Sequence, residues 1–178
     1  MDYRIRTWPD KILKQKMKEV DFFDEKLQNY IDIMFKRMYE EEGVGLAANQ
    51  IGIPYQILVL DTNVKKYDAQ EKEEEGIKMA LINPKIVEKE GRVESTEGCL
   101  SFPGVQITIP RAERVKVIAK NEKGEDIEID TDGFLAIVLQ HEIDHLNGIP
   151  FINHLPPVKR RLVLDKYLKN KKQTAKAR

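Results

Sequence analysis

The stretch with the clearest chemical potential is HEIDH, at residues 141–145. Read as a helix, it places His141 and His145 one turn apart on one face, where both imidazoles can bind one metal ion. Glu142 lies beside that face and is placed to take a proton from a metal-bound water rather than to bind the metal. A glutamate directly after the first of two such histidines is a signature of metal-dependent hydrolases, and it favours that reading over two surface histidines on a buried helix.

A catalytic metal held by two histidines needs a third protein ligand. One class of HExxH peptidases uses a downstream glutamate, but no Glu follows Glu142, and Phe151 stands where the HExxHxxGxxH class needs its last histidine. The residues themselves leave three options open, which are His154, a carboxylate and a residue upstream. Cys99, the only cysteine, lies upstream in the stretch EGCLS at 97–101, and its flanking glycine is typical of a turn that presents a thiolate.

Three stretches belong together: GVGLAANQ at residues 43–50, EGCLS at 97–101 and QHEIDHL at 140–146. They resemble the three signature motifs of the peptide deformylase family, in the same order and at compatible spacing. The resemblance, which is to the bacterial type, includes Pro9-Asp10 and the basic C-terminal segment, so it spans nearly the whole chain. Asn49 stands where many members carry proline, and Phe102 where a smaller aliphatic residue is usual, but neither change alters an expected catalytic atom.

The resemblance implies a hydrolase that removes the N-formyl group from the N-terminal methionine of nascent polypeptides. It implies one divalent metal ion, with Fe(II) as the expected native ion and Zn, Ni or Co as alternatives. The expected ligands are Cys99, His141 and His145. Glu142 is then the general base and acid, while the Gln50 amide and the Leu100 backbone N–H are the expected donors to the oxyanion of the tetrahedral intermediate.

The resemblance also implies an apolar pocket for the methionine side chain. The expected lining residues are Val44, Phe134, Ile137 and Val138, and the last three precede His141 by about one and two helical turns. We expect the peptide backbone to pair with Val44, Gly45 and Gly98 as an added strand.

Other functions compete with this one. An HExxH metallopeptidase that cleaves internal peptide bonds is the main alternative, and a non-enzymatic, metal-stabilised binding module is a second. The glycines at 43 and 45 are also compatible with a phosphate cradle, but no GK[ST] follows them.

Length and composition indicate one domain over residues 1–178, and the family resemblance implies that it is a single catalytic domain. The net charge is zero and the pI is about 6.9, which argues neither for nor against nucleic acid. A single cysteine excludes a disulfide framework and fits a reducing compartment. Because residues 1–10 carry no long apolar run and no stretch approaches a membrane span, we expect a cytoplasmic protein with no membrane or DNA partner.

Two helices are expected to frame the motifs. The first runs from about 24 to 42, with Asp24 as its N-cap and an apolar stripe at helical spacing: Leu27, Ile31, Met34 and Met38. Gly43 and Gly45 stop it. The second carries HEIDH, with Thr131 or Asp132 as a possible N-cap and Gly148 and Pro150 at its end. Its apolar residues surround it on all sides, which predicts a buried helix.

Strands are expected at residues 55–61 and 79–84, the second ended by Pro84, with shorter ones at 85–88, 106–109, 115–119 and 126–130. The like-charged stretch 71–75 reads as an exposed loop, and the role of the charged segment 65–78 is open. The predicted fold is therefore α+β, with short, mostly antiparallel strands around a central metal-binding helix.

Residues 156–178 are expected to form a basic C-terminal helix and tail. From position 159 to 178 there are nine Lys or Arg and one acid, Asp165, so this segment carries +8 and the remainder −8. Pro156-Pro157 suits a helix start, the pairs Val163/Tyr167 and Leu164/Leu168 can dock it, and the chain past Lys169 is expected to be a mobile tail. The alternative to a solvated helix is the ribosomal RNA contact near the exit tunnel that the family resemblance implies.

Overall fold

A computed structural model describes residues 2–64 and 76–176, so the stretch 71–75 and most of the segment 65–78 lie outside the described residues. The helices are α1 (Glu25–Glu40), α2 (Gly133–Leu146) and α3 (Pro157–Lys176). The strands are β1 (Gly45–Ala47), β2 (Ile57–Asp61), β3 (Lys78–Glu90), β4 (Val93–Gly98), β5 (Gln106–Arg111), β6 (Arg114–Lys120) and β7 (Asp126–Asp132). This mixture confirms the predicted α+β class.

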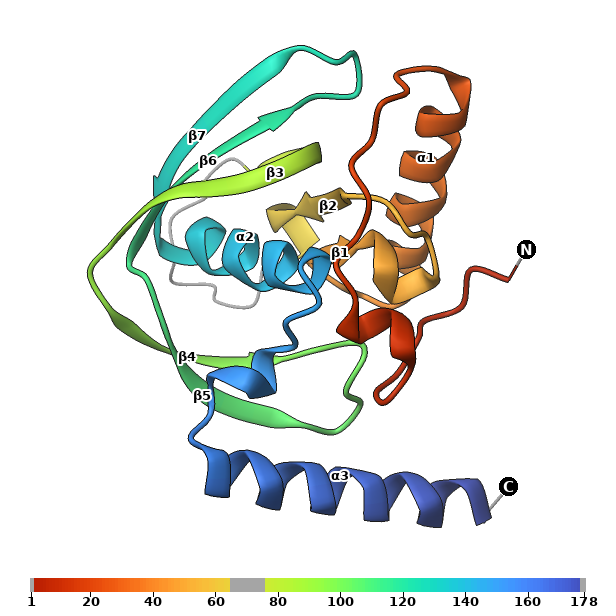
Figure 1. Cartoon of the computed structure of the whole chain (residues 1–178), viewed down its shortest axis with the longest axis vertical. Coiled ribbons are helices and arrows are strands. Elements are labelled where there is room, and N and C mark those ends of the chain that lie inside the picture. Colours follow the sequence, from red (N-terminus) through yellow and green to blue (C-terminus); the bar gives the residue numbers. More distant parts are fainter. Residues whose placement is uncertain (1, 65–75, 177–178) are drawn as a thin grey trace.

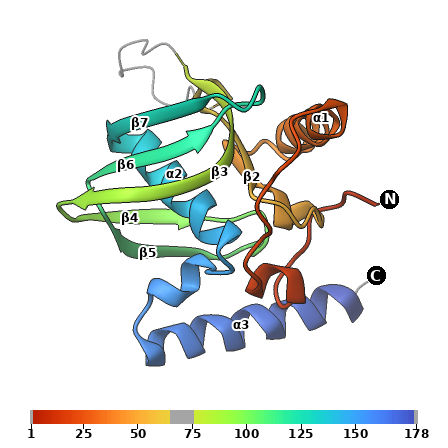
Figure 2. The same ribbon diagram turned by 45° about the horizontal axis from the view of Figure 1, so that its top comes forward.

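The strands form two antiparallel sheets that enclose α2. One has the order β1-β2-β3-β6-β7, and the other is the pair β4-β5. Figures 1 and 2 show α2 in the concave space between the two sheets, with α1 beyond the β1 end of the larger one and α3 across the outer side of the β4-β5 pair. The helix that carries HEIDH is thus the centre of the fold, as predicted.

The predicted N-terminal helix is confirmed in α1. The Asp24 carboxylate accepts hydrogen bonds from the backbone N–H groups of Lys26 (3.1 Å) and Leu27 (3.3 Å), which is how an N-cap satisfies the free donors of a first turn. The four residues of the apolar stripe are buried. The helix therefore packs through the face that its periodicity indicated.

Helix α2 ends where the sequence predicted and begins at Gly133, after Asp132. The glycine at position 148, just beyond its C-terminus, has a φ of 72°, and a Cβ there would lie 2.7 Å from the carbonyl carbon of Lys14. Glycine is therefore required on both steric and conformational grounds. The expectation of a helix buried on all sides was wrong at Phe134, which is 47% exposed at the N-terminal end.

The strand prediction was wrong at Pro84. Instead of two short strands separated there, β3 is one strand of 13 residues that passes through the proline. Its pairing with β6 shifts register between Ile82 and Lys85, and Asn83 has a positive φ of 51°. A proline is tolerated at such an irregularity because no ladder hydrogen bond is needed from its nitrogen. Strands β1 and β4 were not predicted.

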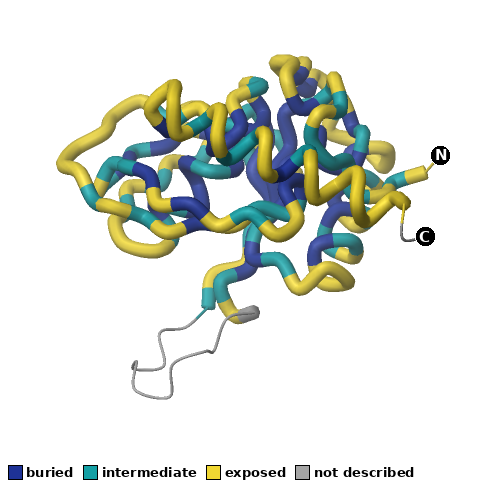
Figure 3. Tube along the Cα trace, turned by 90° about the horizontal axis from the view of Figure 1, so that it is seen from below, coloured by how far each residue is buried: buried dark blue, intermediate teal, exposed yellow. Residues whose placement is uncertain are grey.

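Two hydrophobic cores lie inside the molecule, where Figure 3 shows the buried parts of the trace. The larger core joins α1, α2 and the five-stranded sheet. The smaller core joins β5, helix α3 and the turn that follows α2. Tyr167 is the one buried residue that α3 contributes to it. Helix α3 continues to Lys176, so the tail predicted past Lys169 is helical over its described part. None of the helices in residues 2–64 and 76–176 combines the length and apolar character needed to cross a membrane.

Candidate metal centre and active-site pocket

Three potential ligands from two elements meet beside α2. His141 and His145 come from the helix, and Cys99 follows the last residue of β4. One donor atom from each of the three lies within 4.8 Å of the others, and Cys99 Sγ is 3.2 Å from His145 Nε2. The rings of the two α2 histidines also lie edge to face, with their centroids 5.0 Å apart. This spacing fits a single ion between one sulfur and two nitrogens.

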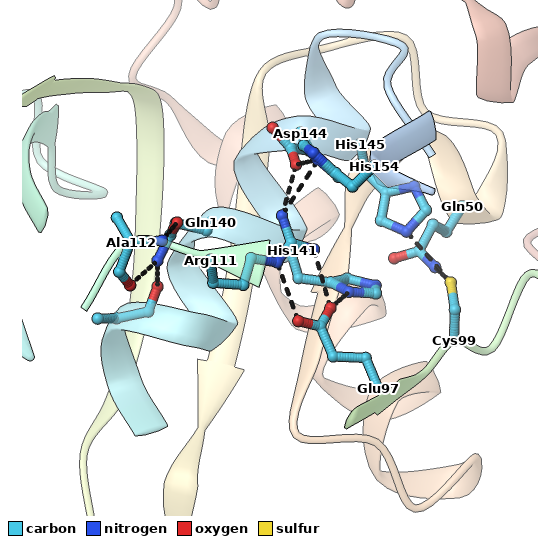
Figure 4. Close-up of polar contacts among 11 residues, drawn as sticks. Gln50, Glu97, Cys99, Arg111, Ala112, Gln140, His141, Asp144, His145 and His154 are labelled. Carbon is cyan, nitrogen blue, oxygen red and sulfur yellow. Dashed lines mark hydrogen bonds and ion pairs between the residues drawn. The ribbon is translucent and has the colours of Figure 1, made fainter. Parts of the chain in front are cut away.

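Glu97 orients His141 from behind. Its Oε1 is 2.8 Å from His141 Nδ1, a contact that leaves the other ring nitrogen for a metal (Figure 4). Burial raises the pKa of Glu97, but hydrogen bonds from Arg111 and His141 outweigh burial and lower that pKa to about 2. Burial is the main cause that holds the pKa of His145 well below its ordinary value. Burial acts on His141 as well, but hydrogen bonds with Cys99 and Glu97 outweigh it and hold the pKa of His141 well above its ordinary value.

Arg111 connects this carboxylate to the end of α2. Its NH1 group donates to Asp144 Oδ2 at 2.7 Å, and His154 Nε2 lies 2.8 Å from the same oxygen. His154 was one of the options for the third ligand, but its ring bonds to Asp144 and lies outside the group formed with Cys99. No role was predicted for Arg111 or Asp144, because Arg111 at the end of β5, Asp144 in α2 and His154 after α2 meet only in the folded chain.

Glu142 lies at the inner end of the pocket. Its side chain is 6% exposed, and Oε2 has no hydrogen-bond partner among the described residues. Burial is the main cause that raises the pKa of Glu142 to about 7. Gly45 of β1 packs directly on it, since a Cβ at Gly45 would lie 3.0 Å from Glu142 Cγ. A carboxyl group with such a pKa can both accept and return a proton near neutrality.

Gln50 is fixed so that its amide nitrogen faces the cysteine. Its Oε1 accepts a hydrogen bond from the Ala47 N–H at 3.0 Å. Its Nε2 donates to Ser101 Oγ at 3.1 Å and lies 3.7 Å from Cys99 Sγ. The side chain is 2% exposed, which fits a preorganised donor better than a surface glutamine. Ser101 belongs to the EGCLS stretch, but no role was predicted for it from the sequence.

A pocket of about 480 Å³ opens onto this group. Its lining includes every residue predicted to contact substrate: Val44, Gly45, Gly98, Phe134, Ile137 and Val138. It also includes Gln50, Cys99, Leu100, His141 and Glu142, whereas His145 is buried behind them. The hydroxyl-bearing residues Ser95 and Thr96, on the unpredicted strand β4, belong to the lining as well.

Two strand edges border the pocket. Strand β1, which contains Gly45, pairs with β2 on one side, and β4, which ends at Gly98, pairs with β5 on one side. In the sheets of the described residues, the other edge of each strand has no partner strand. An extended peptide can therefore add to β1, to β4 or between them.

Comparisons with known proteins agree with these features. The sequence profile of the family described as polypeptide deformylase matches residues 2–161. The chain is 49% identical over 165 residues to the peptide deformylase of Aquifex aeolicus, covering 93% of this chain and 94% of that one. It is 43% identical to the peptide deformylase of Chromobacterium violaceum, covering 95% and 96%. The crystal structure of a peptide deformylase from Legionella pneumophila superposes with a TM-score of 0.85 at 41% identity, covering 98% of each chain.

Proposed function

The chain belongs to the polypeptide deformylase family, whose members remove the N-formyl group from nascent chains, and on this premise we propose how its own residues share that hydrolysis. The protein is a hydrolase of this class, and the peptidase alternative is not favoured. The observation that carries the proposal is the meeting of three potential metal ligands with the buried Glu142 at the inner end of one pocket.

We assign the metal ligands as Cys99, His141 and His145. Their donor atoms lie close enough for one ion, and Glu97 holds the His141 ring from the opposite side. When bound, the ion supplies Lewis-acid polarisation of the formyl carbonyl and makes a water molecule more acidic. One sulfur and two imidazole donors suit Fe(II), Zn, Ni or Co, and we propose Fe(II) as the native ion.

Glu142 acts as the general base and then as the general acid. Because burial raises the pKa of its carboxyl group to about 7, the side chain can take a proton from the attacking water near neutral pH. It then returns that proton to the amine nitrogen that leaves as the C–N bond of the formamide breaks. The absence of a hydrogen-bond partner for Oε2 within residues 2–64 and 76–176 leaves this oxygen available to the water.

Gln50 and Leu100 stabilise the negative charge that develops on the formyl oxygen. The Gln50 side-chain oxygen Oε1 accepts a hydrogen bond from the Ala47 N–H, so the side-chain nitrogen Nε2 is already directed toward the region beside Cys99. The Leu100 residue lines the pocket next to it, where its backbone N–H is the second donor. Donors that are fixed before the reaction need no reorganisation in the transition state.

The formyl-methionine side chain occupies the apolar part of the pocket, between Val44 and the α2 residues Phe134, Ile137 and Val138. A formyl carbon carries only hydrogen, so a narrow site beside Glu142 is sufficient for it. The peptide that follows lies along Gly45 and Gly98, whose strands have the edges described above.

The basic helix α3 is proposed to bind the ribosome near the exit tunnel. Residues 159–178 carry a net charge of +8, and Lys159, Arg161, Lys166, Lys169 and Lys172 are exposed. Ribosomal RNA offers a dense array of phosphates to such a surface. This location would present formylated chains to the pocket as they emerge.

A cytoplasmic location is proposed as well. The proposed ligand Cys99 is the only cysteine, and a free thiolate is retained best in a reducing compartment. Neither DNA nor a membrane is expected as a partner.

A direct test is the deformylation of formyl-Met-Ala peptides by protein purified without oxygen, with metal analysis of the same sample. We expect rapid release of formate, about one metal ion per chain and iron as the main metal. An acetyl-Met-Ala peptide is the control and should react far more slowly. Equal turnover of the two peptides would refute the assignment of a formyl-specific site.

A further inference from the structure

The inner face of α3 completes the smaller hydrophobic core, and this core also supports the proposed metal ligand. Tyr167 is 5% exposed, and its ring centroid lies 5.5 Å from that of Phe102. Cys99 packs against the same core. The Phe102 N–H donates a hydrogen bond to the Cys99 carbonyl oxygen at 3.0 Å, so the two residues belong to one turn. The helix therefore contacts the turn that presents the sulfur.

The backbone of Trp8 joins α3 to this turn directly. The Trp8 carbonyl oxygen accepts hydrogen bonds from Tyr167 Oη at 3.0 Å and from Lys171 Nζ at 2.7 Å. The Trp8 N–H donates to the carbonyl oxygen of Ser101 at 2.9 Å, and its ring stacks on Phe102 with centroids 5.4 Å apart. Trp8 is thus hydrogen-bonded to α3 through its carbonyl group and to the turn of Cys99 through its N–H group.

The same N-terminal segment also holds the proposed oxyanion donor. The Arg6 N–H donates to the carbonyl oxygen of Gln50 at 2.6 Å, and the Gln50 side chain donates to Ser101 Oγ at 3.1 Å. On the other side of the core, Phe151 lies 5.2 Å from Phe102 and 5.6 Å from the ring of His141. The packing that α3 completes therefore reaches several of the proposed catalytic groups.

We propose that Tyr167 is a positioning residue for the reaction. Through its hydrogen bond to Trp8, which bonds to Ser101 and stacks on Phe102, it fixes the turn of Cys99 and Ser101, and so sets the sulfur and the Gln50 amide in place. Helix α3 is then an integral part of the active site on its inner face, while its basic outer face remains free for a partner. This inference rests on the proposed role of Cys99 as a metal ligand.

The contrast between the two faces of α3 provides a matched test. Full-length wild type, Tyr167→Ala, Tyr167→Phe and Leu162→Ala would be loaded with Co(II), since Leu162 is 65% exposed on the same helix. The measurements are the Co(II) dissociation constant by chelator competition, the sulfur-to-cobalt absorption band, and kcat and KM for a formyl peptide. For Tyr167→Ala we expect about 10-fold weaker Co(II) binding. Replacing a residue that supports a metal ligand typically weakens metal binding about 10- to 100-fold, and Tyr167 acts on the ligand only indirectly.

The absorption band of Tyr167→Ala should shift, and kcat should fall with little change in KM, because the affected groups act on the chemistry rather than on peptide binding. Tyr167→Phe should change in the same direction by less, and Leu162→Ala should match wild type. A folded Tyr167→Ala protein with wild-type Co(II) affinity and absorption band would overturn the inference, even if its melting temperature were lower.

If Tyr167→Ala fails to fold, the double variant Tyr167→Phe/Lys171→Met decides the matter, because it removes both donors to Trp8 and keeps the rings packed. Wild-type Co(II) affinity in that variant would overturn the inference. A wild-type protein without a sulfur-to-cobalt band would instead refute the proposed metal site itself, so the two failures are distinguishable.

Discussion

Arg111 holds Glu97 by two parallel hydrogen bonds, from Nε to Oε2 at 2.9 Å and from NH2 to Oε1 at 2.8 Å. The Arg111 side chain is 2% exposed, and the third nitrogen of its guanidinium donates a hydrogen bond to Asp144. Because Glu97 also contacts His141 Nδ1, this arrangement fixes a ring of the proposed metal centre through a carboxylate that is itself fixed (Figure 4). Bidentate pairs of this kind combine strength with a defined orientation.

Replacing Arg111 should therefore cost both stability and metal affinity. Arg111→Met leaves Glu97 and Asp144 without their shared partner in a buried site, and removal of one member of such a pair costs about 3–5 kcal/mol of unfolding free energy. Metal affinity should fall about 10- to 100-fold as His141 loses its orientation. Urea unfolding and chelator competition would measure the two effects. Arg114→Met removes an arginine from exposed ion pairs and is the control, with little change expected in either.

The lowered pKa of Glu97 predicts a loss of stability in acid. In the unfolded chain this carboxyl group titrates near its ordinary value of 4.5, whereas its pKa in the folded protein is about 2. The contribution is therefore complete above about pH 4.5, and it is lost as the pH falls toward 2. Its size is on the order of 3 kcal/mol. Unfolding free energies measured between pH 6 and 3 should fall less steeply for Glu97→Gln than for wild type, and equal slopes would contradict the prediction.

Glu142→Ala should separate catalysis from metal binding. The side chain is proposed to move protons and not to bind the ion, so the variant should keep its metal and lose at least about 100-fold in rate. Glu142→Gln preserves the shape and should lose a similar amount, which would identify the missing function as proton transfer. Glu122→Gln, on the exposed β6–β7 turn, is the control. A near wild-type rate for either Glu142 variant would show that another group is the base.

Gly45→Ala tests the close approach of β1 to the proposed base. The added methyl carbon would lie 3.0 Å from Glu142 Cγ, 3.1 Å from Glu142 Oε1 and 3.1 Å from Val138 Cγ1. Glu142 should be displaced, and a shift of about 1 Å in a catalytic group can cost up to about 100-fold in rate. Metal content should stay unchanged, because the three atoms nearest to the new carbon belong to Glu142 and Val138 and not to a proposed ligand. A wild-type kcat would mean that Glu142 retains its position after the substitution.

Local sequence patterns were sufficient for part of the fold and of the site. The apolar stripe and Asp24 located α1, and the HEIDH stretch with Gly148 located α2 and its end. These helix features depend on neighbours within a turn or two, which is the range that periodicity and capping report. That Gln50, Cys99 and Glu142 line one pocket was expected from the family resemblance and not from any local pattern.

The remaining features depend on contacts between distant parts of the chain. Strand β4 has a mixed polar pattern, and its pairing with β5 defines it more than its own residues do. The bonds that join Arg111 to Asp144 and Tyr167 to Trp8 connect residues that are 33 and 159 positions apart. Single-sequence reasoning has no signal at such distances, and for this reason α3 was expected to be held only by a narrow apolar stripe.

The last prediction concerns the outer face of α3 and ribosomes. Truncation after Pro157 would remove the basic charge, but it would also remove Tyr167 from the smaller core. Replacing Lys159, Lys166 and Lys169 with Gln is a cleaner change, since all three side chains are exposed. Co-sedimentation with ribosomes at low salt should weaken, because the variant makes fewer phosphate contacts and its binding therefore releases fewer counterions. The slope of log affinity against log salt should become shallower by about 2 to 3 if all three contacts are lost.

The matched control replaces Lys85, Lys89 and Lys123 with Gln, which changes the net charge equally at exposed positions away from α3. If overall charge alone drives binding, both triple variants should weaken to the same extent. If α3 is the contact, only the α3 variant should weaken, and both should deformylate a short formyl peptide at the wild-type rate, since none of the six lysines lines the pocket. Sedimentation of the α3 variant at the wild-type level across a salt series would show that this helix does not dock to the ribosome.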